Sequence, residues 1–95
     1  MSTPVYIPTA LRPYANNQDT IELEGSTIGE LLNTLSADYP DLRRHLFTEQ
    51  GTLRNFVNVY VNDDDIRYLK QTDTELKAGD TVTIVPAVAG GSRNA

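Results

Sequence analysis

The spacing of apolar residues changes along this chain from the period of a strand to that of a helix and back again. Residues 3–8 (TPVYIP) and 19–24 (DTIELE) alternate apolar and polar side chains and predict two strands, and the turn formers in YANNQD between them predict a hairpin. Residues 56–62 (FVNVYVN) and 81–85 (TVTIV) predict two more strands. Residues 66–69 are long enough only for an edge strand.

One segment between these strands has helical spacing. Its apolar residues recur at i, i+3, i+4 and i+7 and line one stripe: Ile28, Leu31, Leu32 and Leu35. Thr27 followed by Glu30 matches a capping box, so we expect the helix to begin at this point. Pro40 disfavours helical geometry in the residue before it, so the helix should end near Asp38. A short second helix is predicted within residues 41–47 (DLRRHLF).

Two strands, one main helix and then two or three strands predict an α+β protein with the helix across one face of a mixed sheet of four to five strands. A β-grasp architecture satisfies this order. With 95 residues in all, one hydrophobic core is expected, in a domain spanning residues 1–86. Residues 87–95 are predicted to form a flexible tail with a diglycine and a four-residue extension.

The charge and composition exclude several partners. A net charge of -5 gives the wrong sign of field for a phosphate backbone, so we expect no nucleic-acid partner. The chain has no cysteine, which excludes disulfides and thiolate sites. It shows neither a signal sequence nor an apolar run long enough to cross a bilayer, so we expect a cytoplasmic protein without a membrane partner.

No residue pattern indicates a catalytic group, a metal site or a bound cofactor. His45 is the single histidine and is interpreted as a partly exposed helix residue. The acidic run NDDDIR lacks the ligand spacing of a calcium loop and is interpreted as a solvated turn. Arg43 and Arg44 fit an exposed helix face, and AGGS lacks the lysine of a phosphate-binding loop.

Three apolar side chains point outward from their predicted strands: Tyr6, Tyr60 and Val85. If their strands lie side by side, the three form an exposed strip to which a partner can bind. The alternative is that they are scattered surface residues, which are common singly. The chemistry of the tail also allows two interpretations. The small residues Ala89, Gly90 and Gly91 could lie extended in a narrow slot of a partner, or they could be an ordinary frayed terminus.

Three stretches, in this order along the chain, resemble the ubiquitin-like sulfur carriers of the MoaD/ThiS family. They are IPTALRPYA at residues 7–15, FVNVYVNDDDIRYL at residues 56–69 and DTVTIVPAVAGG at residues 80–91. The resemblance spans nearly the whole chain and is closest to the CysO-type carriers of bacterial cysteine synthesis. It implies a ubiquitin-like β-grasp fold and a carrier with no catalytic group of its own.

The resemblance also implies what the tail does. The Gly91 carboxylate would be adenylated with ATP by a ubiquitin-activating-like adenylyltransferase, and a sulfurtransferase would supply the sulfur that converts it to a thiocarboxylate. A PLP-dependent cysteine synthase would accept the sulfur, and a metalloprotease would release the product. Gly90 and the small residues before it would lie in the partner's channel: Pro86, Ala87, Val88 and Ala89.

One feature departs from this pattern, because SRNA follows the diglycine. While Gly91 is in a peptide bond to Ser92 it has no carboxylate to activate, so the resemblance implies cleavage between these two residues. Three alternatives stay open. They are the small subunit of molybdopterin synthase, a ubiquitin-like modifier joined to target lysines, and a β-grasp interaction module with an incidental tail.

Overall fold

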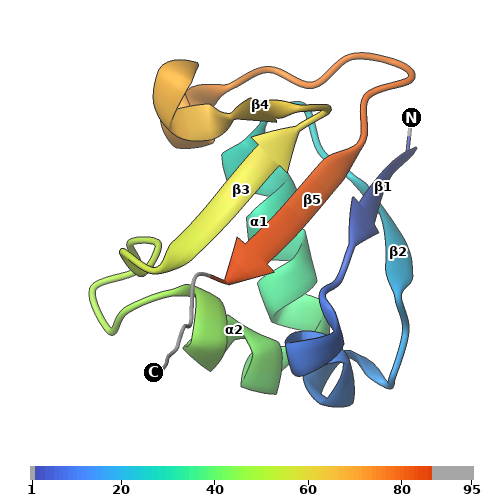
Figure 1. Cartoon of the computed structure of the whole chain (residues 1–95), viewed down its shortest axis with the longest axis vertical. Helices are drawn as coiled ribbons and strands as arrows, with labels where there is room; N and C mark the ends of the chain where they lie inside the picture. Colours follow the sequence, from blue (N-terminus) through green and yellow to red (C-terminus); the bar gives the residue numbers. More distant parts are fainter. Residues whose placement is uncertain (1, 87–95) are drawn as a thin grey trace.

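The structure is a computed structural model that describes residues 2–86 (Figure 1). Its five strands form one mixed sheet in the order β2-β1-β5-β3-β4. The strands are β1 (Ser2–Tyr6), β2 (Thr20–Glu24), β3 (Val57–Val61), β4 (Asp64–Asp65) and β5 (Val82–Pro86). β1 and β5 are parallel, and the other pairs are antiparallel. The last strand in sequence is therefore the central strand of the sheet.

Two α-helices cover one face of this sheet, α1 (Ile28–Asp38) and α2 (Pro40–Leu46). Figure 1 shows α1 crossing behind the strands and α2 at the end of the molecule toward which β5 points. Three short 3-10 helices complete the fold: η1 (Thr9–Ala15), η2 (Ile66–Tyr68) and η3 (Gln71–Asp73). Within residues 2–86, no helix combines the length and hydrophobicity that a membrane crossing requires. The predicted β-grasp order, with one main helix across a mixed sheet, is confirmed.

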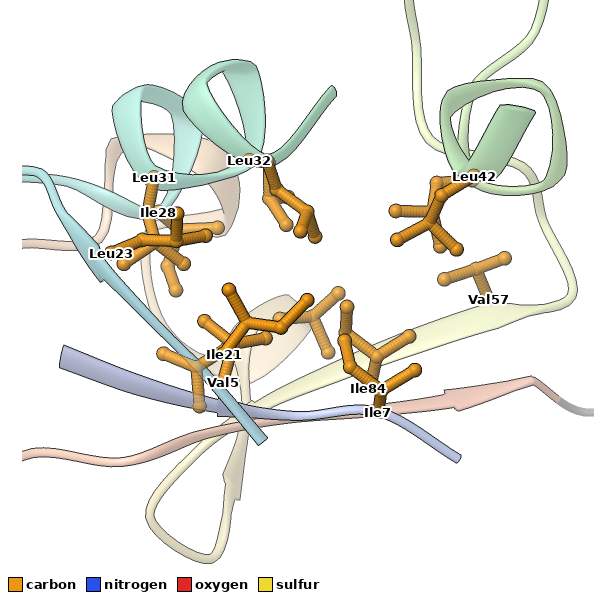
Figure 2. Close-up of a cluster of buried hydrophobic side chains, with 14 of the residues drawn as sticks. Val5, Ile7, Ile21, Leu23, Ile28, Leu31, Leu32, Leu42, Val57 and Ile84 are labelled. Carbon is orange, nitrogen blue, oxygen red and sulfur yellow. The ribbon is translucent and has the colours of Figure 1, made fainter. Parts of the chain in front are cut away.

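The core lies between the sheet and the helices, as Figure 2 shows for the side chains of both layers. The helical stripe predicted from sequence is completely buried: Ile28, Leu31, Leu32 and Leu35. The sheet supplies the opposing side chains, which include Val5, Ile21, Val59 and Ile84. Leu42 and Leu46 of α2 extend the core toward one end of the sheet. Complete burial of one such side chain contributes about 1.5–3 kcal/mol, so this set dominates the stability of the domain.

The start of α1 is fixed by two reciprocal hydrogen bonds. The Thr27 hydroxyl accepts from the Glu30 backbone N–H at 3.2 Å, which confirms the predicted cap. The Glu30 carboxylate accepts from the N–H of Ser26 at 2.9 Å, one residue earlier than in a standard capping box. The helix ends at Asp38, as the proline at position 40 predicts.

The prediction of an edge strand at residues 66–69 is wrong. Asn62 adopts the left-handed conformation (φ 58°) in a two-residue turn after β3. The chain reverses there, and Asp64 and Asp65 pair with Val61 and Tyr60 as β4. The Asp65 carboxylate then accepts a hydrogen bond from the N–H of Arg67 at 2.9 Å and caps η2 in place of a strand. The connection between β1 and β2 also differs from a simple hairpin, because it contains η1.

A polar clamp joins the β3–β4 turn to the start of β5. The side-chain amide of Asn62 donates to the Asp80 carboxylate at 3.1 Å, and its oxygen accepts from the N–H of Thr81 at 3.2 Å. Asp80 also accepts from the N–H of Lys77 at 2.8 Å. These bonds lower the pKa of Asp80, the one from Lys77 having the largest effect and the one from Asn62 the second. The clamp therefore aligns β5 beside β3 at the end remote from Pro86.

Candidate functional site

The root of the tail lies in the middle of the sheet. Pro86, the last described residue, pairs with Val57 of β3, and the first two residues of β5, Val82 and Thr83, also pair with β1. Because β1 and β5 are parallel and β3 is antiparallel to them, the chain leaves the sheet between the end of β1 and the beginning of β3. The position of Pro86 is thus set by the ladder with β3, while the ladder with β1 fixes the first half of β5.

The sheet register brings two tyrosines to opposite sides of one threonine. Tyr6 of β1 and Tyr60 of β3 are both paired with Thr83 of β5. Alternation along β5 places Val85 on the same face, one step closer to the tail. This face is opposite to α1, and Tyr6 and Val85 are 43% and 40% exposed there. We call Tyr6, Tyr60, Thr83 and Val85 the outer-face strip.

The strip combines apolar and hydrogen-bonding groups. Each tyrosine carries an aromatic ring and a hydroxyl that can donate or accept a hydrogen bond. Thr83 was not among the predicted partner residues, although the alternation in TVTIV already assigned it to the outward face. Phe56, which immediately precedes β3, is 45% exposed and was likewise not predicted as part of such a surface.

The predicted tail residues lie outside the described residues: Ala87, Val88, Ala89, Gly90, Gly91 and Ser92. Pro86 is the exception and is half-buried at the end of β5. The described part of the site is therefore the root of the tail and the outer-face strip beside it.

The other residues considered from sequence have local structural contacts. His45 is exposed on α2 and stacks on Tyr14 of η1, with ring centroids 4.0 Å apart. Arg43 and Arg44 are exposed on α2, and Arg44 lies 3.9 Å from the carboxylate of Asp41. Within residues 2–86, no three His, Asp or Glu side chains come together in a group that could hold a metal ion.

A mixed five-stranded sheet crossed by one main helix, with the C-terminal strand in its centre, defines the ubiquitin-like β-grasp class. The chain belongs to the ThiS family, whose sequence profile matches residues 5–91. The match begins in β1 and ends on the second glycine of the diglycine.

Relatives of this family match nearly the whole chain. Sulfur carrier protein CysO of Mycobacterium tuberculosis is 42% identical over 93 residues, which cover 96% of this chain and all of the relative. The solved structure of an Amycolatopsis orientalis BexX/CysO complex contains a chain that is 39% identical and superimposes with a TM-score of 0.84, covering 94% of this chain and 99% of that one. Small archaeal modifier protein 3 of Haloferax volcanii is 37% identical over 68 residues, 72% of this chain and 73% of the relative.

Proposed function

We propose that this protein is a sulfur carrier whose Gly91 carboxylate is converted to a thiocarboxylate that supplies sulfur for cysteine biosynthesis. The observation that carries the proposal is the end-to-end similarity to sulfur carrier CysO, together with a family match that ends at Gly91. The protein acts as a co-substrate of other enzymes in the cytoplasm, and the reacting atoms on its side are those of its own C-terminal carboxylate.

The chemistry has two steps at one carbonyl. A carboxylate oxygen of Gly91 attacks the α-phosphorus of ATP on an adenylyltransferase, and pyrophosphate leaves. Sulfide delivered by a sulfurtransferase then attacks the acyl carbon, AMP leaves with the oxygen that joins it to the carbonyl, and loss of the remaining sulfur-bound proton gives the thiocarboxylate. Adenylation is needed because a free carboxylate has no adequate leaving group, and the unbranched carbon of glycine leaves the carbonyl unhindered.

The folded body contributes binding energy far from the reacting carbonyl. Docking through the outer-face strip would orient the tail before either chemical step and so reduce the entropy cost of reaction. The residues between the sheet and Gly91 have small or compact side chains, which suit a narrow channel that excludes water: Pro86, Ala87, Val88, Ala89 and Gly90. Pro86 emerges directly beside Val85 of the strip, so one enzyme surface can engage both.

The proposed sulfur acceptor is an activated serine derivative held by a PLP-dependent cysteine synthase. The activated oxygen substituent leaves the β-carbon of that unit and the thiocarboxylate sulfur bonds to the β-carbon in its place. A shift of the acyl group from sulfur to the amino group then gives a cysteinyl adduct of the carrier. Hydrolysis by a metalloprotease releases cysteine and regenerates the Gly91 carboxylate. ATP and PLP are thus cofactors of the partner enzymes in this proposal.

The proposal requires cleavage between Gly91 and Ser92 before activation, since the peptide bond there occupies the carboxyl group. Intact-mass measurement of the protein from its native cell, under sulfur limitation, tests both steps. We expect a chain that ends at Gly91, part of it heavier by the difference between one sulfur and one oxygen atom. A chain that retains Ser92 under these conditions would refute the carrier function.

A second candidate is a ubiquitin-like modifier, favoured by the 37% identity to small archaeal modifier protein 3. In this case the activated Gly91 acyl group is transferred to a lysine amine, with loss of AMP, to form an isopeptide bond. Mass spectrometry of digested cell protein distinguishes the two, because a modifier leaves a tail remnant ending in Gly91 on target lysines. A carrier gives free thiocarboxylate and no such remnant.

A further inference from the structure

Four arginines belong to the segments around the root of the tail. In Figure 1, η1 and α2 lie at the end of the molecule toward which β5 points, and the β3–β4 turn lies at the opposite end. The segments at the tail end carry Arg12 in η1, Arg43 and Arg44 in α2, and Arg54 just before β3. Residues 7–19 and 38–56 also contain four carboxylates, so this end is about neutral in sum: Asp19, Asp38, Asp41 and Glu49. The far end is acidic, since residues 63–80 contain six carboxylates and three basic side chains.

Two of these arginines are held by the backbone on either side of the tail root. The Nε of Arg12 donates to the carbonyl oxygen of Ile7, just beyond β1, at 3.1 Å. The Nε of Arg54 donates to the carbonyl oxygen of Arg44, in the last turn of α2, at 2.9 Å. Each bond uses one edge of the guanidinium and limits its rotation. The remaining Nη groups are thereby presented in a fixed fork, which suits a bidentate acidic ligand.

Three of these four arginines form no ion pair with a carboxylate among residues 2–86. Among residues 2–86 the two ion pairs are those of Arg44 with Asp41 and Arg67 with Asp65. Arg12 and Arg54 form none there, and the side chain of Arg43 is exposed with neither an ion pair nor a hydrogen bond in this part of the chain. Three tail-end arginines that form no ion pair within residues 2–86, despite four carboxylates in the same segments, indicate a surface for an anionic group of a partner.

The length of the tail distinguishes two anionic ligands for these arginines, the phosphate of ATP at Gly91 and acidic groups of the enzyme near the sheet. Gly91 follows Pro86 by five residues, and the narrow channel of the proposed function requires an extended tail. At roughly 3.3 Å per residue, the reacting carbonyl in that channel would lie up to roughly 16 Å from the sheet. Guanidinium groups anchored at Ile7 and Arg44 are too short to reach a phosphate at that point. Their ligands must instead lie at the entrance of the channel that the tail enters.

We propose that Arg12, Arg43 and Arg54 bind acidic side chains at the channel entrance of the activating enzyme, an inference that rests on the proposed function. The arginines orient the carrier with its tail toward the enzyme, while the acidic far end is repelled by the same carboxylates. In this complex the outer-face strip makes the apolar contact with the enzyme, and the arginines set the orientation in which the carrier binds.

The experiment uses the carrier processed to Gly91 and the activating enzyme of the same cell, with ATP–pyrophosphate exchange measured against carrier concentration. The double variant Arg12→Gln/Arg54→Gln and the single variant Arg43→Gln remove the charges. Lys70→Gln/Lys77→Gln at the acidic end is the matched control. For the double variant we expect KM to rise about tenfold, kcat to stay unchanged and the dependence of KM on salt to weaken. Arg43→Gln should shift KM in the same direction, and the control should behave as wild type.

The experiment distinguishes failure of this inference from failure of the proposed function. Wild-type KM in both arginine variants would overturn the inference and leave the proposed function intact. A lower kcat at saturating carrier with unchanged KM would place the arginines at the transferred phosphate and would also overturn it. If the double variant unfolds, as a thermal melt would report, Arg43→Gln decides, because its side chain makes no bond that supports the described fold. Absence of exchange with wild-type carrier refutes the proposed function, and the inference with it.

Discussion

Tyr6 and Tyr60 lie on opposite sides of Thr83, one on each strand that borders β5. Under the proposed function, Tyr60→Ala removes an aromatic ring from the middle of the docking surface. We expect KM for the carrier to rise about tenfold or more in ATP–pyrophosphate exchange, because a buried interface tyrosine is worth about 2 kcal/mol or more. The free energy of unfolding should fall by about 1 kcal/mol or less, because Tyr60 lies outside the core but is half-buried between β4 and β5.

The matched control for Tyr60→Ala is Tyr68→Ala. Tyr68 is 88% exposed in η2, outside the outer-face strip, so its loss removes a similar ring without affecting the proposed interface. An equal rise in KM for both variants would mean that docking does not depend on the strip.

The backbone at Gly25, between β2 and α1, lies close to the backbone of α1 at Leu31. A Cβ added at this position would lie 2.8 Å from the backbone nitrogen of Leu31 and 3.0 Å from its Cα. Because these are helix backbone atoms, Gly25→Ala must displace α1 or the connection before it. We expect a loss of about 1–3 kcal/mol in the free energy of unfolding, measured by urea titration.

Gly29→Ala is the comparison for Gly25→Ala. Its Cβ would lie 3.2 Å from the carbonyl oxygen of Thr72 in η3, a contact that opposes the gain of about 1 kcal/mol from replacing a helical glycine. We expect its stability to stay within about 1 kcal/mol of wild type. Equal stability of the two variants would show that the space around Gly25 is not limiting.

The cap of α1 gives a third prediction. Thr27→Ala removes the hydroxyl that accepts from the N–H of Glu30, and we expect a loss of about 1 kcal/mol, seen in thermal or urea unfolding. Thr34→Ala is the control, because the hydroxyl of Thr34 donates to the Glu30 carbonyl inside α1 and satisfies no free N–H. If Thr34→Ala costs as much as Thr27→Ala, the cap has no special role.

The lowered pKa of Asp80 predicts a stability that depends on pH. Its folded-state pKa lies below the unfolded value of roughly 3.9, so the unfolded chain takes up the proton first as the pH falls. The stabilisation is fully present above the unfolded pKa and is lost as the pH falls through the lower folded value. Wild type should therefore be more stable than Asp80→Asn at neutral pH, and the difference should shrink on acidification.

Urea unfolding of both proteins at several pH values measures this difference. Asp64→Asn, at an exposed carboxylate that accepts no hydrogen bond within the described residues, is the control. A constant difference between wild type and Asp80→Asn across the acid range would refute a role for the Asp80 carboxylate.

The regular elements could be predicted because their patterns are local. The alternation around Val59 and the stripe that contains Leu32 each describe one buried face, and both are buried in the structure. The path after Val61 could not be predicted from such periods. It depends on the positive φ of Asn62 and on the cap formed by Asp65, neither of which changes an apolar pattern. The 3-10 helix η1 was also missed, because it contains Pro13 and buries only Leu11 and Ala15, so its residues do not form the apolar stripe of an α-helix.

The candidate site was predictable only in part. Alternation assigns Tyr6, Tyr60 and Val85 to outward faces, but it gives no strand order. Their proximity depends on the insertion of β5 between β1 and β3, a pairing between residues far apart in the sequence. The anchors of Arg12 and Arg54 were not foreseen either, since a hydrogen bond to a backbone carbonyl leaves no signature in the residue types. The resemblance in DTVTIVPAVAGG supplied the assignment of Gly91.

The central position of β5 has a mechanical consequence. Tension applied to Pro86 runs along a strand that is paired with β1 on one side and with β3 on the other. Because the bonds of the antiparallel β3–β5 ladder lie across the strand direction, such a pull loads them in shear, and the two-pair ladder with β1 at Val82 and Thr83 adds to the resistance. If a partner enzyme holds the tail, as the proposed function requires, force on the tail reaches the domain along β5 and is borne first by its ladder with β3.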